Sequence, residues 1–376
     1  MRLSPALTGL RTYPFVRLDE AKRRLQADGV DFIDFGVGEP REETPAFIRD
    51  ALVAAIEPLS TYPAAVGLPD LRAAIAEWTG RRFAVALDPD TQVLPTLGSK
   101  EAIFHMAQVL GGDLVAVPAP AYPVYERGAA FAGKEVLELP LREDGGFLPD
   151  LDAVDTDTWE RVALLWLNYP NNPTAATAPR ALYERAAELA REHGFIVASD
   201  EAYSEIYFGE PPVSALELDD LTGVAVLNTL SKRSSMPGYR SGFVAGDPEL
   251  IALLKRYRPN VGVAPQAFVQ HAAAAAWRDE AHVEQVRAGY RAKRDVLLPV
   301  LEARGLRNAG GDATFFLWLD AGPGAELLAD RLLGEGIVLA PGSFFGPAGT
   351  GYLRLALVPT LAGCERAAER LDALLR

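Results

Sequence analysis

Short apolar runs alternate with longer helical patterns over the first 250 residues, and this alternation limits the possible folds more than any other feature. The runs are apolar at nearly every position, which is typical of strands buried on both faces of a sheet. They cover residues 32–36, 92–98, 114–119, 135–141, 163–170, 195–203, 225–231 and 242–247. Helical patterns such as 69–83 and 179–194 lie between them. The alternation predicts an α/β fold with a mostly parallel central sheet covered by helices.

The pattern changes near residue 265, and the change indicates a second domain. A chain of 376 residues is long enough for two domains at roughly 150 residues each. Residues 279–305 read as one long amphipathic helix, and short apolar runs follow it at 314–320, 336–341 and 352–358. We therefore predict a large domain of residues 41–275 and a smaller α+β domain made of residues 1–40 and 276–376.

Charge and composition exclude several kinds of function. The formal net charge of -14 argues against a protein that binds nucleic acid or an anionic membrane, because both need a basic surface. Cys364 is the only cysteine, and the four histidines show no metal-ligand spacing, so we expect neither an internal disulfide nor a metal site. No apolar run approaches the ~20 residues of a membrane span, and the first residues lack the apolar core of a signal peptide. We expect a soluble cytoplasmic protein.

Polar residues follow the ends of five predicted strands. Ligands of an open parallel sheet bind beyond the carboxyl ends of its strands, so these residues should meet at one edge. They are Ser99, Lys100, Tyr122, Asn172, Asp200, Tyr203, Thr229, Ser231 and Lys232.

The residue types at this edge match the parts of one cofactor. Ser99 at a helix start, Thr229, Ser231 and the nearby Arg240 could hold a phosphate. Tyr122 offers a flat face to an aromatic ring, and Asn172 and Tyr203 could hydrogen-bond a phenolate oxygen. A buried Asp200 needs a cationic partner such as a protonated pyridine nitrogen, and Lys232 could form a Schiff base with an aldehyde. Together these groups predict pyridoxal 5'-phosphate (PLP).

Three segments carry a family resemblance. "NNPT" (171–174), "SDEAY" (199–203) and "SKRSSMPGYRSGF" (231–243) resemble the class I/II aminotransferases, the fold-type I PLP enzymes, and the resemblance spans essentially the whole chain. It implies that Lys232 carries the Schiff base and moves the proton, with Asp200 on the pyridine nitrogen and Asn172 and Tyr203 on the ring oxygen.

The resemblance also assigns the phosphate, the substrate and a partner subunit. It places Ser99, Lys100, Arg240 and either Thr229 or Ser231 at the phosphate, and Tyr122 against the ring. Arg354 in "YLRLALV" would bind the substrate α-carboxylate together with the loop at Gly38 in "GVGEP". Tyr62 would reach the phosphate of a neighbouring subunit, so we expect a homodimer with shared active sites that acts on small amino and keto acids.

A narrower resemblance concerns the substrate. "TYPFVRLDEAK" (12–22), "LSKRSSMPGYRSGFVAGD" (230–247) and "AAAWRDEAHV" (274–283) resemble the bacterial succinyldiaminopimelate aminotransferases of lysine biosynthesis. The resemblance implies amino transfer between glutamate and N-succinyl-LL-diaminopimelate, with Arg17 or Arg233 on the distal carboxylate.

Other substrates stay open at this stage. Ala175 replaces the usual glycine after "NNPT", and "GSKE" (98–101) is also seen in sequences like LL-diaminopimelate aminotransferase. The alternatives are an LL-diaminopimelate, aspartate or aromatic aminotransferase, a PLP-dependent C–S lyase, and a PLP-sensing regulatory module.

Overall fold

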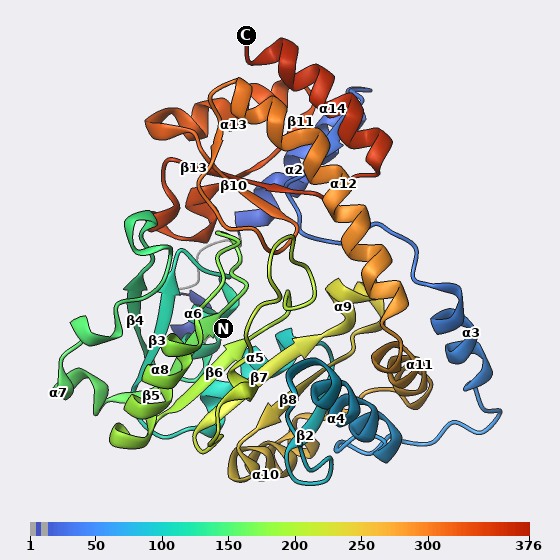
Figure 1. Ribbon diagram of the computed structural model, residues 1–376, viewed down its shortest axis with the longest axis vertical. Coiled ribbons are helices and arrows are strands. Elements are labelled where there is room, and N and C mark those ends of the chain that lie inside the picture. The colour runs from blue at the N-terminus through green and yellow to red at the C-terminus, as the bar shows by residue number, and fades with distance from the viewer. Residues whose placement is uncertain (1–4, 9–13) are drawn as a thin grey trace.

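A seven-stranded mixed sheet forms the centre of the protein in a computed structural model that describes residues 5–8 and 14–376 (Figure 1). Its strands are, in spatial order, β2 (Val93–Thr96), β8 (Gly242–Gly246), β7 (Val224–Thr229), β6 (Ile196–Asp200), β5 (Val162–Asn168), β3 (Leu114–Ala119) and β4 (Glu135–Pro140). Only β8 runs antiparallel to its neighbours, and the adjacent strands from β7 to β4 are all parallel. The predicted α/β class with a mostly parallel sheet is confirmed.

Helices cover both faces of this sheet, which explains why its strands are apolar at most positions. On β5, Leu164 packs into one core cluster and Leu165 into another, because successive side chains of a strand point to opposite faces. The first cluster contains residues of α5 (Ser99–Met106), α6 (Val124–Phe131) and α10 (Pro248–Tyr257). The second contains residues of α4 (Pro69–Phe83), α8 (Arg180–His193) and α11 (Ala267–Arg278). The predicted helices at 69–83 and 179–194 correspond closely to α4 and α8.

A second group of elements lies at one end of the molecule, at the top of Figure 1. It contains a four-stranded antiparallel sheet in the order β12 (Ala340–Pro341), β13 (Tyr352–Ala356), β10 (Phe316–Asp320) and β9 (Arg307–Asn308). The long helix expected at 279–305 is α12 (Ala281–Ala303), and it rises from the large sheet region into this group. The helices α13 (Ala325–Gly334) and α14 (Leu361–Leu374) complete it.

The N-terminal segment returns to this second group. Figure 1 draws α2 (Pro14–Ala27) at the same end of the molecule, and β1 (Ile33–Asp34) pairs in parallel with β11 (Ile337–Val338). The run at 32–36 therefore lies outside the central sheet, although it looks like the other strands. The division into residues 41–275 and residues 1–40 with 276–376 stays a prediction.

The remaining helices are short. They are α1 (Pro5–Thr8), α3 (Ala46–Ala54), α7 (Thr156–Trp159) and α9 (Leu230–Arg233). Thr12 and Tyr13, the first residues of the segment 12–22, lie outside the described residues. Within residues 5–8 and 14–376, none of the helices has both the length and the apolar character needed to cross a membrane.

Candidate active site

The strand ends of the central sheet open into a cavity of about 640 Å³. The second group of elements closes it from the other side through β1, β10, β13 and the segment after β1. The structure brings together on its lining every residue predicted for the cofactor and for the substrate α-carboxylate, except Tyr62. They are Gly38, Ser99, Lys100, Tyr122, Asn172, Asp200, Tyr203, Thr229, Ser231, Lys232, Arg240 and Arg354.

Lys232 lies on the short helix α9, directly after β7. Thr229 caps this helix, because its hydroxyl accepts a hydrogen bond from the Ser231 N–H at 3.2 Å. The Lys232 ammonium donates to the Gly38 carbonyl at 2.6 Å. Burial lowers the pKa of Lys232 to about 8; the nearby Arg354 charge acts in the same direction, and the carboxylate of Glu39 opposes it. A lysine that loses its proton this easily is suited to Schiff-base formation.

Asp200 ends β6 and presents a buried carboxyl group to the cavity. Its Oδ2 accepts a hydrogen bond from the Tyr125 hydroxyl at 2.7 Å, and its Oδ1 accepts one from the Ala202 N–H at 3.3 Å. Burial raises the pKa of Asp200 to about 6, and both hydrogen bonds oppose this rise. A cation placed beside the carboxyl group would favour its ionised form, so the site fits a protonated ring nitrogen.

Tyr125 is a site residue that the sequence reasoning missed. It lies on α6, three residues after the predicted Tyr122, and its ring stacks on Trp166 with 4.9 Å between centroids. Tyr122 precedes the helix, and the two tyrosine rings meet edge-on with 5.9 Å between centroids. A tyrosine on a buried helix face needs a partner for its hydroxyl, and this was the available signal.

Another part of the cavity lining concentrates donors and positive charge. Ser99 is the first residue of α5, so the helix N–H groups of its first turn face the same region. Gly98 before it has φ 70, and a Cβ there would lie 2.6 Å from Arg240 Nη2, so the close approach of Arg240 depends on glycine. Arg240 in turn donates to the Ser231 hydroxyl at 3.4 Å.

Lys100 adds to this positive region. Burial lowers the pKa of Lys100, and the charges of Arg240 and Arg127 lower it further. The repulsion among these cations would be relieved by an anion bound between them. This end of the cavity therefore fits the phosphate of PLP.

Arg354, on β13, links the two groups of elements at the cavity. Its side chain is 3% exposed, and Nη1 donates to Asn172 Oδ1 at 2.8 Å while Nη2 donates to the Gly36 carbonyl at 2.9 Å. Its guanidinium carbon lies 4.2 Å from the ring centroid of Phe316. A Cβ at Gly38 would lie 2.7 Å from the same phenylalanine ring, so only glycine fits there. The guanidinium is thus held rigidly where it can bind a carboxylate.

Aromatic residues and amides complete the lining. Tyr203 packs edge-on against Phe316 with 5.4 Å between centroids, and burial raises its pKa. Asn168 donates to the Asp200 carbonyl at 2.8 Å and accepts from the Asn172 N–H at 2.9 Å, so it fixes the neighbouring strand end. Asn168 was also absent from the sequence prediction.

Two predicted contacts are not made within this chain. Tyr62 is fully exposed, at 102%, and does not line the cavity. Arg17 on α2 is exposed and also lies off the lining.

Arg233 was predicted as a candidate for the distal carboxylate, and this prediction is wrong. Its side chain is 1% exposed, and its guanidinium carbon lies 4.6 Å from the ring centroid of Trp277. It donates to the Ala276 carbonyl at 3.1 Å and to Glu280 Oε1 at 2.9 Å. These contacts fix α9 to the junction of α11 and α12, and they leave no free guanidinium face toward the cavity.

The residues as a whole fit PLP. A region rich in cations and N–H donors lies at one end, a buried carboxyl group lies in another wall, and a lysine with a lowered pKa lies on the same lining. When bound, PLP would supply an electron sink that stabilises negative charge at the α-carbon of an amino acid.

Comparison with known proteins agrees with this geometry. Residues 30–371 match the family model "Aminotransferase class I and II". An LL-diaminopimelate aminotransferase of Nitratidesulfovibrio vulgaris is 40% identical over 98% of this chain and 98% of its own length. The crystal structure of an aminotransferase from Neisseria meningitidis covers both chains completely at 36% identity, with a TM-score of 0.91. A structure from Thermus thermophilus, named "probable N-succinyldiaminopimelate aminotransferase", is 34% identical over 96% of this chain and 99% of its own, with a TM-score of 0.87.

The chain therefore belongs to the class I and II aminotransferases. It is a PLP-dependent enzyme that transfers amino groups between amino acids and keto acids.

Proposed function

We propose that this enzyme moves an amino group between LL-diaminopimelate and the glutamate/2-oxoglutarate pair, in the cytoplasm, as a step of lysine biosynthesis. The support is the 40% identity to LL-diaminopimelate aminotransferase over nearly the full length of both chains. N-succinyl-LL-diaminopimelate, which the sequence resemblance favoured, is the second candidate, supported by the Thermus thermophilus structure.

The proposed roles of the site residues follow from their positions. Arg354 and Asn172 bind the substrate α-carboxylate, and Asp200 holds a proton on the ring nitrogen of PLP through its ionised carboxylate. Lys232 takes the proton from the substrate α-carbon at Nζ and returns it. Ser99, Lys100, Thr229, Ser231 and Arg240 would hold the phosphate. Tyr122 would cover the ring, and Asn172 and Tyr203 would contact its phenolate oxygen.

One observation carries this proposal: Lys232, with a pKa of about 8, shares one cavity with the buried Asp200 and the buried Arg354. We expect Lys232→Ala to abolish transamination and the absorbance of lysine-linked PLP, while PLP still binds through its phosphate. The matched control is Lys255→Ala, since Lys255 lies outside the cavity and donates to the Asp90 carbonyl. Normal transamination by Lys232→Ala would refute the site assignment.

A donor panel tests the substrate. Purified enzyme is given LL-diaminopimelate, N-succinyl-LL-diaminopimelate, aspartate and phenylalanine, each with 2-oxoglutarate, and kcat/KM is compared. We expect the highest value for LL-diaminopimelate. A higher value for the succinylated donor would favour the second candidate, and a higher value for aspartate or phenylalanine would remove both.

We also propose a homodimer in which Tyr62 reaches the partner's cavity. Apolar side chains in and after α3 are unusually exposed: Val53 at 66%, Ile56 at 58% and Leu59 at 77%. Figure 1 shows α3 at the side of the molecule, away from the four-stranded sheet. A surface of this kind is typical of a protein interface. Leu59→Glu should shift the protein toward monomer in light scattering, and a monomeric wild-type protein would contradict the proposal.

A further inference from the structure

We propose that the mouth of the active-site cavity contains a second charged subsite that binds the distal amino-acid end of the substrate. Glu39 would accept the distal ammonium, and Lys22 and Arg41 would bind the distal carboxylate. This inference rests on the proposed diaminopimelate aminotransferase function and specifies how the substrate would be recognised.

The charged residues concerned all line the same cavity as Lys232 and Arg354. They come from one continuous stretch of chain, comprising α2, β1 and the segment that follows β1. The residues are Asp19, Lys22, Asp34, Glu39 and Arg41. Residues that bind the reacting end of the substrate are therefore continuous with residues that could bind its far end.

Asp34 holds the two cations of this subsite in place. Its side chain is only 4% exposed, and Oδ2 accepts from Arg41 Nη2 at 2.9 Å and from Lys22 Nζ at 3.2 Å. Its Oδ1 accepts from the Gly36 N–H at 2.9 Å, so both carboxylate oxygens are satisfied within the fold. Asp34 is thus a positioning residue rather than a ligand for the substrate.

Both cations can still bind an anion. The contact with Asp34 uses one of the five N–H donors of the Arg41 guanidinium, whose side chain is 47% exposed. Burial acts to lower the pKa of Lys22, but the hydrogen bonds and charges of Asp19 and Asp34 outweigh it and raise the pKa. Lys22 therefore stays charged at neutral pH, beside Arg41.

Glu39 differs from the other carboxylates of the subsite because its side chain forms no ion pair with a cation of the described residues, although its charge acts on Lys232. In the part of the chain that the structure describes, no ion pair within 4.0 Å and no hydrogen bond involves its side chain. Its backbone adjoins Gly38, whose carbonyl accepts from Lys232 at 2.6 Å. An exposed carboxylate next to the reacting lysine, with its acceptor positions open, is suited to an ammonium group on the substrate.

The combined charge of the subsite favours one of the two candidate substrates. Its two cations and three carboxylates sum to a net charge of -1. The distal end of LL-diaminopimelate carries one ammonium and one carboxylate, so it presents a group of each sign to partners of each sign. N-succinylation replaces the ammonium by a neutral amide and adds a second carboxylate. The succinylated end would lose its contact with Glu39 and be repelled by it.

Two simpler amino acids isolate the two halves of the subsite. L-2-Aminopimelate lacks only the distal ammonium of LL-diaminopimelate, and L-lysine lacks only its distal carboxylate. The first half-reaction of the PLP-loaded enzyme is followed by the spectral change of the cofactor, and kcat/KM is measured for all three donors. We expect Glu39→Gln to reduce the preference for LL-diaminopimelate over L-2-aminopimelate by about tenfold or more, as for loss of one charged hydrogen bond.

Arg41→Gln should act on the other half. We expect it to reduce the preference for LL-diaminopimelate over L-lysine, and to leave the preference over L-2-aminopimelate nearly unchanged. Glu43→Gln is the matched control for Glu39→Gln, because Glu43 belongs to the same segment but is 89% exposed and lies off the cavity lining. It should behave like the wild-type enzyme.

The outcomes separate the inference from the function on which it rests. If LL-diaminopimelate is a good donor but Glu39→Gln changes all three donors equally, the distal subsite is refuted and the proposed function stands. If LL-diaminopimelate does not react with the wild-type enzyme while another donor does, both are refuted.

Discussion

Replacing Tyr125 by phenylalanine tests how the protein keeps Asp200 ionised. The Tyr125 hydroxyl donates to Asp200 Oδ2 at 2.7 Å in a fully buried setting, and this bond opposes the burial that raises the pKa of Asp200 to about 6. A hydrogen bond to a charged group contributes about 1.5–3 kcal/mol. Since one pKa unit corresponds to about 1.4 kcal/mol, its loss should raise the pKa of Asp200 by about one to two units.

The consequence should appear in the pH dependence of PLP binding. An ionised Asp200 is needed to pair with the protonated ring nitrogen, so the affinity of the PLP-free protein for PLP should fall as pH drops through the pKa of Asp200. We expect a midpoint near pH 6 for the wild-type protein and a midpoint about one to two units higher for Tyr125→Phe. PLP binding can be followed by the quenching of tryptophan fluorescence. Titrations with PLP at a series of pH values between 5 and 9 give the midpoint for each protein.

A second tyrosine provides the matched control. Tyr169 is also buried, but its hydroxyl donates to the Phe147 carbonyl at 2.7 Å and it does not line the cavity. Tyr169→Phe should lose stability without moving the midpoint of PLP binding. If Tyr125→Phe and the wild-type protein share one midpoint, the hydrogen bond does not govern the ionisation of Asp200 and the reasoning fails.

Three other substitutions have expected outcomes. Arg354→Lys should raise KM about tenfold or more for every amino donor, because lysine cannot form two parallel hydrogen bonds to a carboxylate. If steady-state kinetics show the increase for one donor only, Arg354 has a role in side-chain specificity instead. Burial raises the pKa of Glu201 from 4.5 to about 7, so its ionisation should destabilise the fold progressively as pH rises from 4.5 to 7. Glu201→Gln removes this effect. In urea titrations, the free energy of unfolding of the variant minus that of the wild type should rise by up to about 3 kcal/mol between pH 5 and pH 8. A difference that does not change with pH would contradict this expectation. Arg233→Lys should lower the free energy of unfolding by about 1–2 kcal/mol, with the relative kcat/KM of different donors unchanged; a change confined to one donor would return Arg233 to a substrate-binding role.

The sequence predicted the composition of the cavity because strand ends of a parallel sheet meet at one edge whatever the details of pairing. Lys232, Asp200 and Asn172 are far apart in sequence, yet each follows an apolar run, so local patterns were enough to bring them together. Pairing partners were harder to predict. The run at 242–247 forms the antiparallel strand β8, and the run at 32–36 leaves the sheet to pair with β11, although both look like the parallel strands. An apolar run indicates that a strand is buried, and burial does not depend on the direction of the strand.

The residues that the sequence reasoning missed are those whose role depends on a single contact across the fold. Tyr125 reads as a core aromatic residue of α6, and only the structure shows its hydroxyl on Asp200. Asp34 reads as one polar position in an apolar run, and only the structure shows it between Lys22 and Arg41. Ala175 shows the converse: its left-handed φ of 60 favours glycine, which the family resemblance led us to expect, but the backbone keeps this conformation with alanine.

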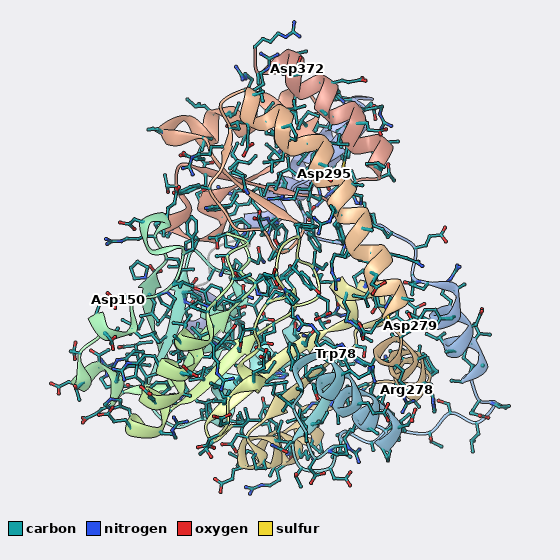
Figure 2. All side chains as sticks on the ribbon, viewed as in Figure 1. Trp78, Asp150, Arg278, Asp279, Asp295 and Asp372 are labelled. Carbon is teal, nitrogen blue, oxygen red and sulfur yellow. The ribbon has the colours of Figure 1, made fainter. Side chains whose placement is uncertain are left out.

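Two of the three segments that carry the narrower resemblance to succinyldiaminopimelate aminotransferases have a structural role that does not involve the substrate. These two segments pack against each other: Arg233 pairs with Glu280 at 2.9 Å, and Ser234 Oγ lies 2.8 Å from His282 Nε2. Asp279, which contacts the same histidine at 2.6 Å, lies at the lower end of α12, while Asp295 lies farther along that helix toward the small sheet (Figure 2).

These contacts fix α9, the helix that carries Lys232, to the start of α12, the helix that leads into the second group of elements. A change in either segment would disturb these contacts, whichever amino acid enters the cavity. Sequence similarity in these two segments therefore reflects how the helix that carries Lys232 is held in place. Enzymes with different amino donors can share this arrangement. We place substrate choice instead with Glu39, Lys22 and Arg41, which line the cavity outside the two packed segments, although Lys22 ends the third segment that carries the resemblance.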